Sequence, residues 1–215
     1  MNKILFLFIL LIFTFSCATS KVSMVSFAEE PQAYYDLQKI GNKILPVMDS
    51  EKMYKYMITI LDSYEVNAFA DGERYIIFFT RGALLLFDEK EMTYIYAHEV
   101  AHITLKHWEK RLIASTTSTV FFSVANVFIP GVGLVNYVAN PLITKAFSRS
   151  QEIDADAEAV KSIEKCCELS PSFAINALSK LLEKAKEKGY KEEDRIGILD
   201  THPSLEERIK RIKMK

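Results

Sequence analysis

Two histidines and a glutamate form the run His98-Glu99-x-x-His102. Residues four apart on an α-helix project from nearly the same face, one turn apart. Two imidazoles so placed can converge on one zinc ion at ~2.0–2.1 Å each. Glu99 borders that face without being a ligand, so it can take a proton from a water molecule that the metal activates. The spacing therefore predicts a zinc site with an adjacent general base.

This interpretation requires the run to lie on a helix. Asp88 followed by Glu91 is typical of a helix N-terminus with a capping box, so we expect a helix from Glu89 to about Lys110. The alternative is structural: two hydrogen-bonded core histidines beside a capping or salt-bridged glutamate. The expected helical context and the mostly apolar neighbours favour the metal.

A catalytic zinc ion usually takes a third protein ligand. The chain has four histidines, and His107 should face elsewhere because five residues on a helix correspond to a rotation of about 140°. Either His202 or a carboxylate must complete the set. Glu152 is the best carboxylate, and it shares a helix face with Asp156, four residues later. One could bind the metal while the other accepts the outer N–H of a ligand histidine. Without the His98–His102 motif, Glu152 and Asp156 would be interpreted as part of a charged helix face exposed to solvent.

The remaining patterns predict a mostly helical α+β protein. Residues 34–48 have a helical apolar period, whereas residues 54–61 and 75–80 are short, aromatic and β-branched, as in strands. Asp71-Gly72 indicates a turn between them. Ser204 with Glu207 predicts a last helix with its own capping box, ending near Ile212.

Composition limits the functional classes. The 215 residues include 27 Lys+Arg and 28 Asp+Glu, a net charge of −1, with 49% hydrophobic residues. This excludes a disordered chain and gives no electrostatic reason to expect a nucleic-acid partner. A chain of this length can bury one core. We expect a linker over residues 17–33 and a single metallopeptidase domain over residues 34–215.

The N-terminus is typical of an export signal. Lys3 precedes the apolar residues 4–15, a block too short to span a bilayer of ~30 Å. The following Thr-Phe-Ser-Cys run resembles a bacterial lipobox, which predicts a signal peptide over residues 1–16, a lipidated Cys17 and attachment to a membrane. The alternatives are cleavage after Ala18 and a buried N-terminal helix.

The sequence leaves two further features undecided: the structure of one segment and the state of two cysteines. Residues 112–144 carry no charge, but prolines, glycines and asparagines interrupt them. We expect two helices around a Pro-Gly turn, either as a lip over a cleft or dipping into a membrane surface. Cys166 and Cys167 could be free, bonded to each other or paired with another chain.

Taken together, these motifs resemble the gluzincin metallopeptidases of the HtpX, BepA and Ste-type (CAAX prenyl-protease-like) group. The match extends from about residue 35 to 213 and includes Thr80-Arg81-Gly82, Ser148-Arg149-x-x-Glu152-x-x-x-Asp156 and Thr201-His202-Pro203 with Arg208. The resemblance implies a zincin-like core around the His98–His102 helix, Glu152 as third zinc ligand, and a His-Pro loop near the metal. It also implies a strand beside the substrate cleft, formed by Asn67, Ala68, Phe69 and Ala70.

The predicted function is that of an exported, periplasmic endopeptidase of the bacterial envelope with one Zn²⁺ per chain. Glu99 would be the general base, and His202 and Arg208 are candidate donors to the oxyanion. Either could be structural instead, and His202 could occupy the open metal position and keep the enzyme latent. Extended segments of unfolded or looped envelope proteins would bind the 67–70 strand, which points to quality control. The alternative is a zinc-containing chaperone or assembly factor that does not cut; processing of prenylated proteins is disfavoured.

Overall fold

The computed structural model describes residues 23–109, 147–187 and 204–214. Within these ranges the protein is a mostly helical α+β fold, as predicted. Its strands and helices are β1 (Met24–Val25), α1 (Pro31–Met48), β2 (Met57–Leu61), β3 (Ala68–Asp71), β4 (Ile76–Thr80), α2 (Arg81–Leu86), α3 (Glu89–Thr104), α7 (Arg149–Cys167), α8 (Ser172–Glu187) and α10 (Leu205–Lys213).

The four described strands form one mixed sheet in the order β1-β2-β4-β3. β2 and β4 are parallel, and β1 and β3 pair antiparallel with them at the two edges. Two boundaries differ from the sequence-based expectation. β1 and the first turn of α1 lie within residues 17–33, which we had expected to be a linker. Residues 24–25 pair with β2 and thereby join the sheet.

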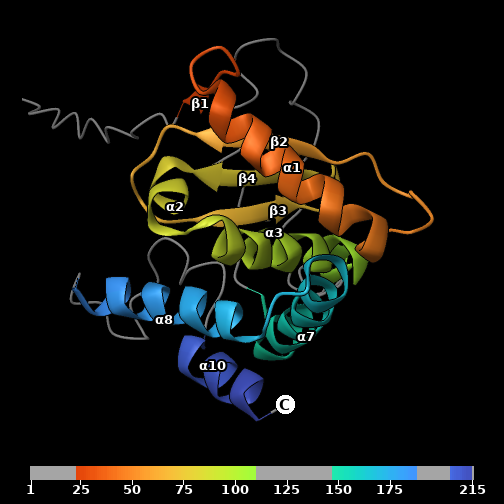
Figure 1. The fold of residues 1–215 in the computed structure, drawn as a ribbon, viewed down its shortest axis with the longest axis vertical. Coiled ribbons are helices and arrows are strands. Elements are labelled where there is room, and N and C mark those ends of the chain that lie inside the picture. Colours follow the sequence, from red (N-terminus) through yellow and green to blue (C-terminus); the bar gives the residue numbers. More distant parts are fainter. Residues whose placement is uncertain (1–22, 110–146, 188–203, 215) are drawn as a thin grey trace, which may run out of the picture.

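Alternate residues of β4 point to opposite faces of the sheet. Ile77 and Phe79 join the main core with α1 and α3, while Phe78 stacks on Phe69 of β3 with ring centroids 4.7 Å apart. In Figure 1, α1 crosses the sheet, α3 runs beside it, and α7, α8 and α10 lie on the far side of α3. The sheet and the C-terminal helices thus enclose α3.

Helix α3 begins as the sequence predicts. Asp88 accepts hydrogen bonds from the backbone N–H groups of Lys90 and Glu91, and the Glu91 carboxylate accepts one from the backbone of Asp88. Every residue from Glu91 to Ile103 is buried. Because every side of this helix is buried, each side must pack against a different part of the protein.

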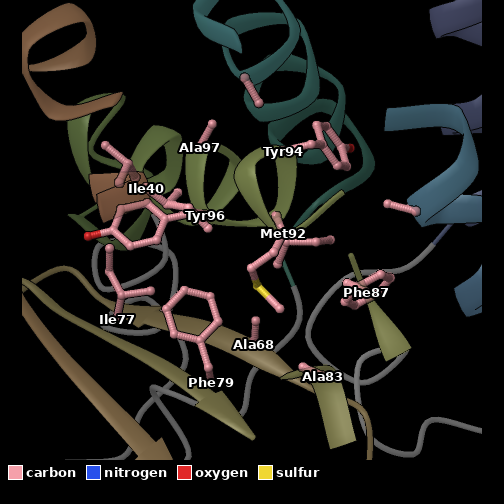
Figure 2. Close-up of a cluster of buried hydrophobic side chains, with 14 of the residues drawn as sticks. Ile40, Ala68, Ile77, Phe79, Ala83, Phe87, Met92, Tyr94, Tyr96 and Ala97 are labelled. Carbon is pink, nitrogen blue, oxygen red and sulfur yellow. The ribbon is translucent and has the colours of Figure 1, made fainter. Parts of the chain in front are cut away.

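The two tyrosines of α3 show this division. Figure 2 places Tyr96 beside Ile77 and Phe79 of the sheet, whereas Tyr94 extends towards another helix. The rings of Tyr96 and Phe79 stack with centroids 5.6 Å apart. Tyr94 donates a hydrogen bond to Asp156 of α7 at 2.6 Å. One side of α3 is therefore fixed by apolar packing and another by a polar contact.

Two local expectations need correction. Helix α3 ends at Thr104 rather than near Lys110, because the chain adopts a left-handed conformation at Lys106 (φ 54°). The last helix forms where predicted, but Ser204 makes no side-chain cap, since it is itself left-handed (φ 68°). Residues 112–144, expected to form two helices, lie outside the described residues.

The structure also shows the state of two other sequence features. The turn predicted at Asp71-Gly72 forms between β3 and β4, where Asp71 accepts hydrogen bonds from the backbone of Glu73 and Arg74. Cys166 and Cys167, whose state the sequence left open, are joined to each other in a disulfide at the end of α7.

Candidate metal centre

Helices α3 and α7 bring three metal-binding side chains together. His98 and His102 lie one turn apart on α3, and Glu152 lies in the first turn of α7. The two Nε2 atoms are 3.1 Å apart. The Glu152 carboxylate lies 3.5 Å from Nε2 of His98 and 3.4 Å from Nε2 of His102. All three side chains are buried. These are the three residues that we proposed as ligands, and the described structure places them in one cluster.

The spacing of these donor atoms suits a tetrahedral metal ion. Ligand atoms held ~2.0–2.1 Å from a tetrahedral zinc ion lie about 3.3 Å from one another. The distance between the two Nε2 atoms, 3.1 Å, and those from each Nε2 to the nearer Glu152 oxygen, 3.5 Å to Oε2 for His98 and 3.4 Å to Oε1 for His102, are close to that value. Two imidazoles and one carboxylate are also a donor set typical of catalytic zinc. The residues present therefore fit the ion that the sequence predicted.

Asp156 supports the first histidine. Its Oδ1 lies 2.9 Å from Nδ1 of His98, so Nδ1–H donates to the carboxylate and Nε2 is left to face the cluster. Burial and the Arg208 charge oppose protonation of His98, but hydrogen bonds to Asp156 and Glu152 outweigh them and raise its pKa to about 9. The structure thus places Asp156 where the i, i+4 pattern predicted a supporting carboxylate.

Arg208 of α10 completes the charge balance. Its side chain donates to Asp156 at 2.7 and 2.8 Å and lies 2.8 Å from Oε2 of Glu152. Burial alone would raise the pKa of Asp156, but the charge and hydrogen bonds of Arg208 and His98 hold it well below its usual range. Of the two roles considered for Arg208, pairing with helix carboxylates is the one that these contacts match; donation to an oxyanion stays a prediction.

Glu99 lies between the two histidines in the sequence of α3 and is 1% exposed. A general base must reach the proton that it abstracts, and Glu99 directly follows the candidate ligand His98 on the same buried helix. Its assignment as the base rests on this placement together with the sequence motif.

His107 differs from our expectation. We expected it to face away from the site, because we extended α3 through it. In the structure the helix has already ended, and Nδ1 of His107 lies 2.9 Å from Nδ1 of His102. His107 is 1% exposed. Sequence reasoning missed this contact, since neither Leu105 nor Lys106 is a residue type that signals a helix end.

The predicted substrate strand is present as β3. It forms one edge of the described sheet, and Ala68, Phe69 and Ala70 are buried in it. Asn67 precedes the strand and is held by Thr80, whose hydroxyl accepts from the Asn67 backbone N–H and donates to its carbonyl, both at 3.0 Å. Contact of this strand with substrate remains a prediction.

Two candidate residues lie outside the described residues. They are His202, predicted near the metal, and Cys17, predicted to be lipidated. Among the helices that the structure describes, none combines the length and apolar character that crossing a membrane requires.

Comparison with known proteins identifies the family. The sequence model of Peptidase family M48 matches residues 31–215. The chain belongs to peptidase family M48. This family consists of metal-dependent peptidases, so the chain is a metallopeptidase, as the resemblance implied.

Individual relatives agree with this assignment. This M48 peptidase is 25% identical over 197 residues to "Protease HtpX" of Legionella pneumophila (strain Corby), covering 73% of this chain and 69% of the relative. It is 27% identical over 192 residues to "Protease HtpX homolog" of Salinibacter ruber, covering 72% and 66%. It is 25% identical over 222 residues to the homolog of Ralstonia nicotianae, covering 87% and 75%.

Proposed function

We propose that this M48 peptidase is a zinc-dependent endopeptidase of the bacterial cell envelope that cleaves unfolded or looped segments of envelope proteins. The observation that carries the proposal is the buried cluster of His98, His102 and Glu152, whose nearest donor atoms lie 3.1 to 3.5 Å apart, with Glu99 on the same buried helix as the two histidines. The identity of the metal and that of the substrate are tested separately below.

The residues of the site divide the chemistry among them. A zinc ion bound by this cluster would polarise the scissile carbonyl and make a water molecule more acidic. Glu99 would take the proton of that water and later deliver it to the leaving amine. Asp156 would hold His98 in the tautomer that presents Nε2. Each of these roles can be tested by replacing one side chain.

The preference for extended segments rests on β3. A strand at the edge of a sheet can pair with an extended peptide through main-chain hydrogen bonds. A folded globular protein rarely offers such a segment, whereas an unfolded one does. The envelope location rests on the export signal in residues 1–16 and on Cys17, whose thioether-linked lipid would be detected by mass spectrometry of the mature protein and lost in Cys17→Ser.

A proteolysis assay with metal control tests the activity. The protein is incubated with a reduced, unfolded test protein, with and without a chelator, and its zinc content is measured. We expect one zinc ion per chain and cleavage that chelation abolishes. Glu99→Gln should keep the zinc and lose about 10²- to 10⁴-fold in rate. Glu89→Gln, on the exposed first turn of the same helix, is the matched control and should cleave normally.

The same assay separates the rival function. A zinc-containing chaperone would suppress aggregation of the unfolded protein without cutting it, and Glu99→Gln would behave as the wild type does. Equal behaviour of the two proteins, with zinc bound in both, would therefore reject the endopeptidase.

A further inference from the structure

The short turn after α3 folds back onto the candidate metal centre. Lys106 is left-handed (φ 54°) and its N–H donates to the carbonyl of Ile103 at 3.0 Å, which ends the helix. The reversal brings the His107 ring to the outer nitrogen of His102, with the two Nδ1 atoms 2.9 Å apart. Both rings are buried. A buried hydrogen bond between two imidazole nitrogens requires one to donate and the other to accept.

The position of His102 decides which nitrogen donates. Its Nε2 faces Nε2 of His98 at 3.1 Å and Glu152 at 3.4 Å, which is the side of the cluster. A metal ligand must offer an unprotonated nitrogen, so the proton of a neutral His102 belongs on Nδ1. His107 must then accept through its own Nδ1 and carry its proton on Nε2.

We infer that His107 is a positioning residue for metal binding, which accepts the Nδ1–H hydrogen bond of His102 and so fixes the tautomer and ring orientation that direct Nε2 to the metal. The inference rests on the proposed zinc site. It gives the two ligand histidines different supports, a carboxylate for His98 and a neutral imidazole for His102.

Two further contacts hold this arrangement against α7. The carbonyl oxygen of His107 accepts a hydrogen bond from Nε2 of Gln151 at 3.1 Å, and Gln151 immediately precedes the ligand Glu152. Phe147, just before the same helix, stacks on the His102 ring with centroids 3.6 Å apart and planes 14° apart. The segment that carries His107, directly after the turn, is thus tied to the helix that supplies the third candidate ligand.

The next residue anchors the turn at its other end. The indole of Trp108 packs so closely on Gly72, at the end of β3, that a Cβ there would lie 1.9 Å from the ring. Only glycine leaves room for this contact, so the turn is fixed both to the sheet and to α7. Because its own carbonyl and the next residue are both held, His107 has little freedom to move away from its partner, as a positioning role requires.

Zinc affinity tests the inference. It is measured by competition with a chromophoric chelator for the wild type, His107→Leu and His107→Asn, with circular dichroism and the melting temperature of each metal-free protein as controls for folding. Leucine fills the space without an acceptor, whereas the asparagine carbonyl can replace Nδ1. We expect His107→Leu to bind zinc about 10- to 100-fold more weakly and His107→Asn to recover most of that loss. Equal affinity of His107→Leu and wild type overturns the inference, and so does an equal loss in both variants.

A second measurement uses the wild type alone, so it does not depend on the folding of a variant. In ¹⁵N NMR spectra of the zinc-loaded protein, we expect Nδ1 of His102 to be protonated and Nδ1 of His107 to be unprotonated. A proton on Nδ1 of His107 overturns the inference. Failure of the proposed function is distinguishable, because the wild type itself would then bind no zinc.

Discussion

Arg208, on α10, lies 2.8 Å from the Oε2 atom of Glu152, the candidate metal ligand in the first turn of α7. The same guanidinium also binds Asp156, which supports His98. The buried guanidinium of Arg208 therefore compensates two buried carboxylates, that of the candidate ligand Glu152 and that of Asp156, the hydrogen-bond partner of His98. Burial of all three groups depends on the correct docking of α10 against α7.

Replacing Arg208 should destabilise the metal-free protein. Arg208→Met leaves Glu152 and Asp156 buried with less compensating charge, and breaking a buried ion pair costs about 3–5 kcal/mol. Zinc should restore part of the loss, because the ion would neutralise Glu152, one of the two carboxylates. Urea unfolding with chelator and with zinc measures both effects. Arg211→Met, whose guanidinium is exposed and pairs with Glu207, should change stability by no more than about 0.5 kcal/mol. An Arg208→Met protein as stable as Arg211→Met would contradict this prediction.

Replacing Asp156 should weaken zinc binding without abolishing it. Asp156→Asn keeps an oxygen that can accept from Nδ1 of His98 but removes the charge that makes the imidazole a better ligand. Loss of such a partner costs about 10- to 100-fold in metal affinity. Chelator competition measures the change, with Asp154→Asn, two residues earlier on α7, as the control. Unchanged affinity in Asp156→Asn would show that the negative charge of Asp156 has no influence on the metal.

Zinc binding should release a proton near neutral pH. Since the pKa of His98 is raised to about 9 in the metal-free protein, His98 carries a proton at pH 7 that must leave before Nε2 can bind the ion. Calorimetric titrations in buffers of different ionisation enthalpy count the released protons. We expect about one proton from His98 at pH 7 and close to none from it above pH 10. A proton count that does not vary between these pH values would be inconsistent with the raised pKa.

The same pKa fixes how the stability of the metal-free protein varies with pH. The folded-state pKa of His98 lies above its ordinary value of 6.5, so its contribution is fully present below about pH 6.5 and disappears as the pH rises through 9. The loss should amount to about 1–3 kcal/mol. Asp156 acts in the opposite direction: its pKa is depressed, so its contribution is present above about pH 4 and is lost only in acid. Urea unfolding in chelator at pH 6, 7.5 and 9 tests the first of these effects, with His98→Gln as the comparison that should lack it.

Replacing Thr80 should both destabilise the protein and disturb the edge strand β3. Its hydroxyl exchanges hydrogen bonds with the backbone of Asn67, before β3, and also accepts from the backbone N–H of Ala83 to cap α2. Thr80→Val keeps the shape but removes the acceptor of the Asn67 and Ala83 backbone N–H groups, at a cost of about 1–3 kcal/mol. The Asn67 carbonyl keeps its hydrogen bond from the backbone N–H of residue 80. If β3 binds substrate, KM for an unfolded test protein should rise more than kcat falls. Thr93→Val, on α3, is the control; a loss of kcat alone would argue against a role of β3 in binding.

The local part of the site could be predicted from the sequence. The i, i+4 spacings of His98 with His102 and of Glu152 with Asp156 depend only on helix geometry, which neighbouring residues determine. The same holds for the start of α3, where Asp88 and Glu91 satisfy the first backbone N–H groups through short-range contacts. The family resemblance extended these patterns to Glu152 as the third ligand, and the structure brings its carboxylate within 3.5 Å of both imidazoles.

Only the tertiary structure decided how His107 and Arg208 are used. No glycine or asparagine marks the left-handed turn at Lys106, so no residue type in this segment predicts that α3 ends before His107. The contacts of that turn with Gln151 and Gly72 join segments more than 30 residues apart. Likewise, nothing near Arg208 in the sequence identifies Glu152 and Asp156 as its partners. Such pairings depend on how whole helices pack. An unpaired charge costs free energy only when it is buried, so the packing that buries these groups must also bring opposite charges together.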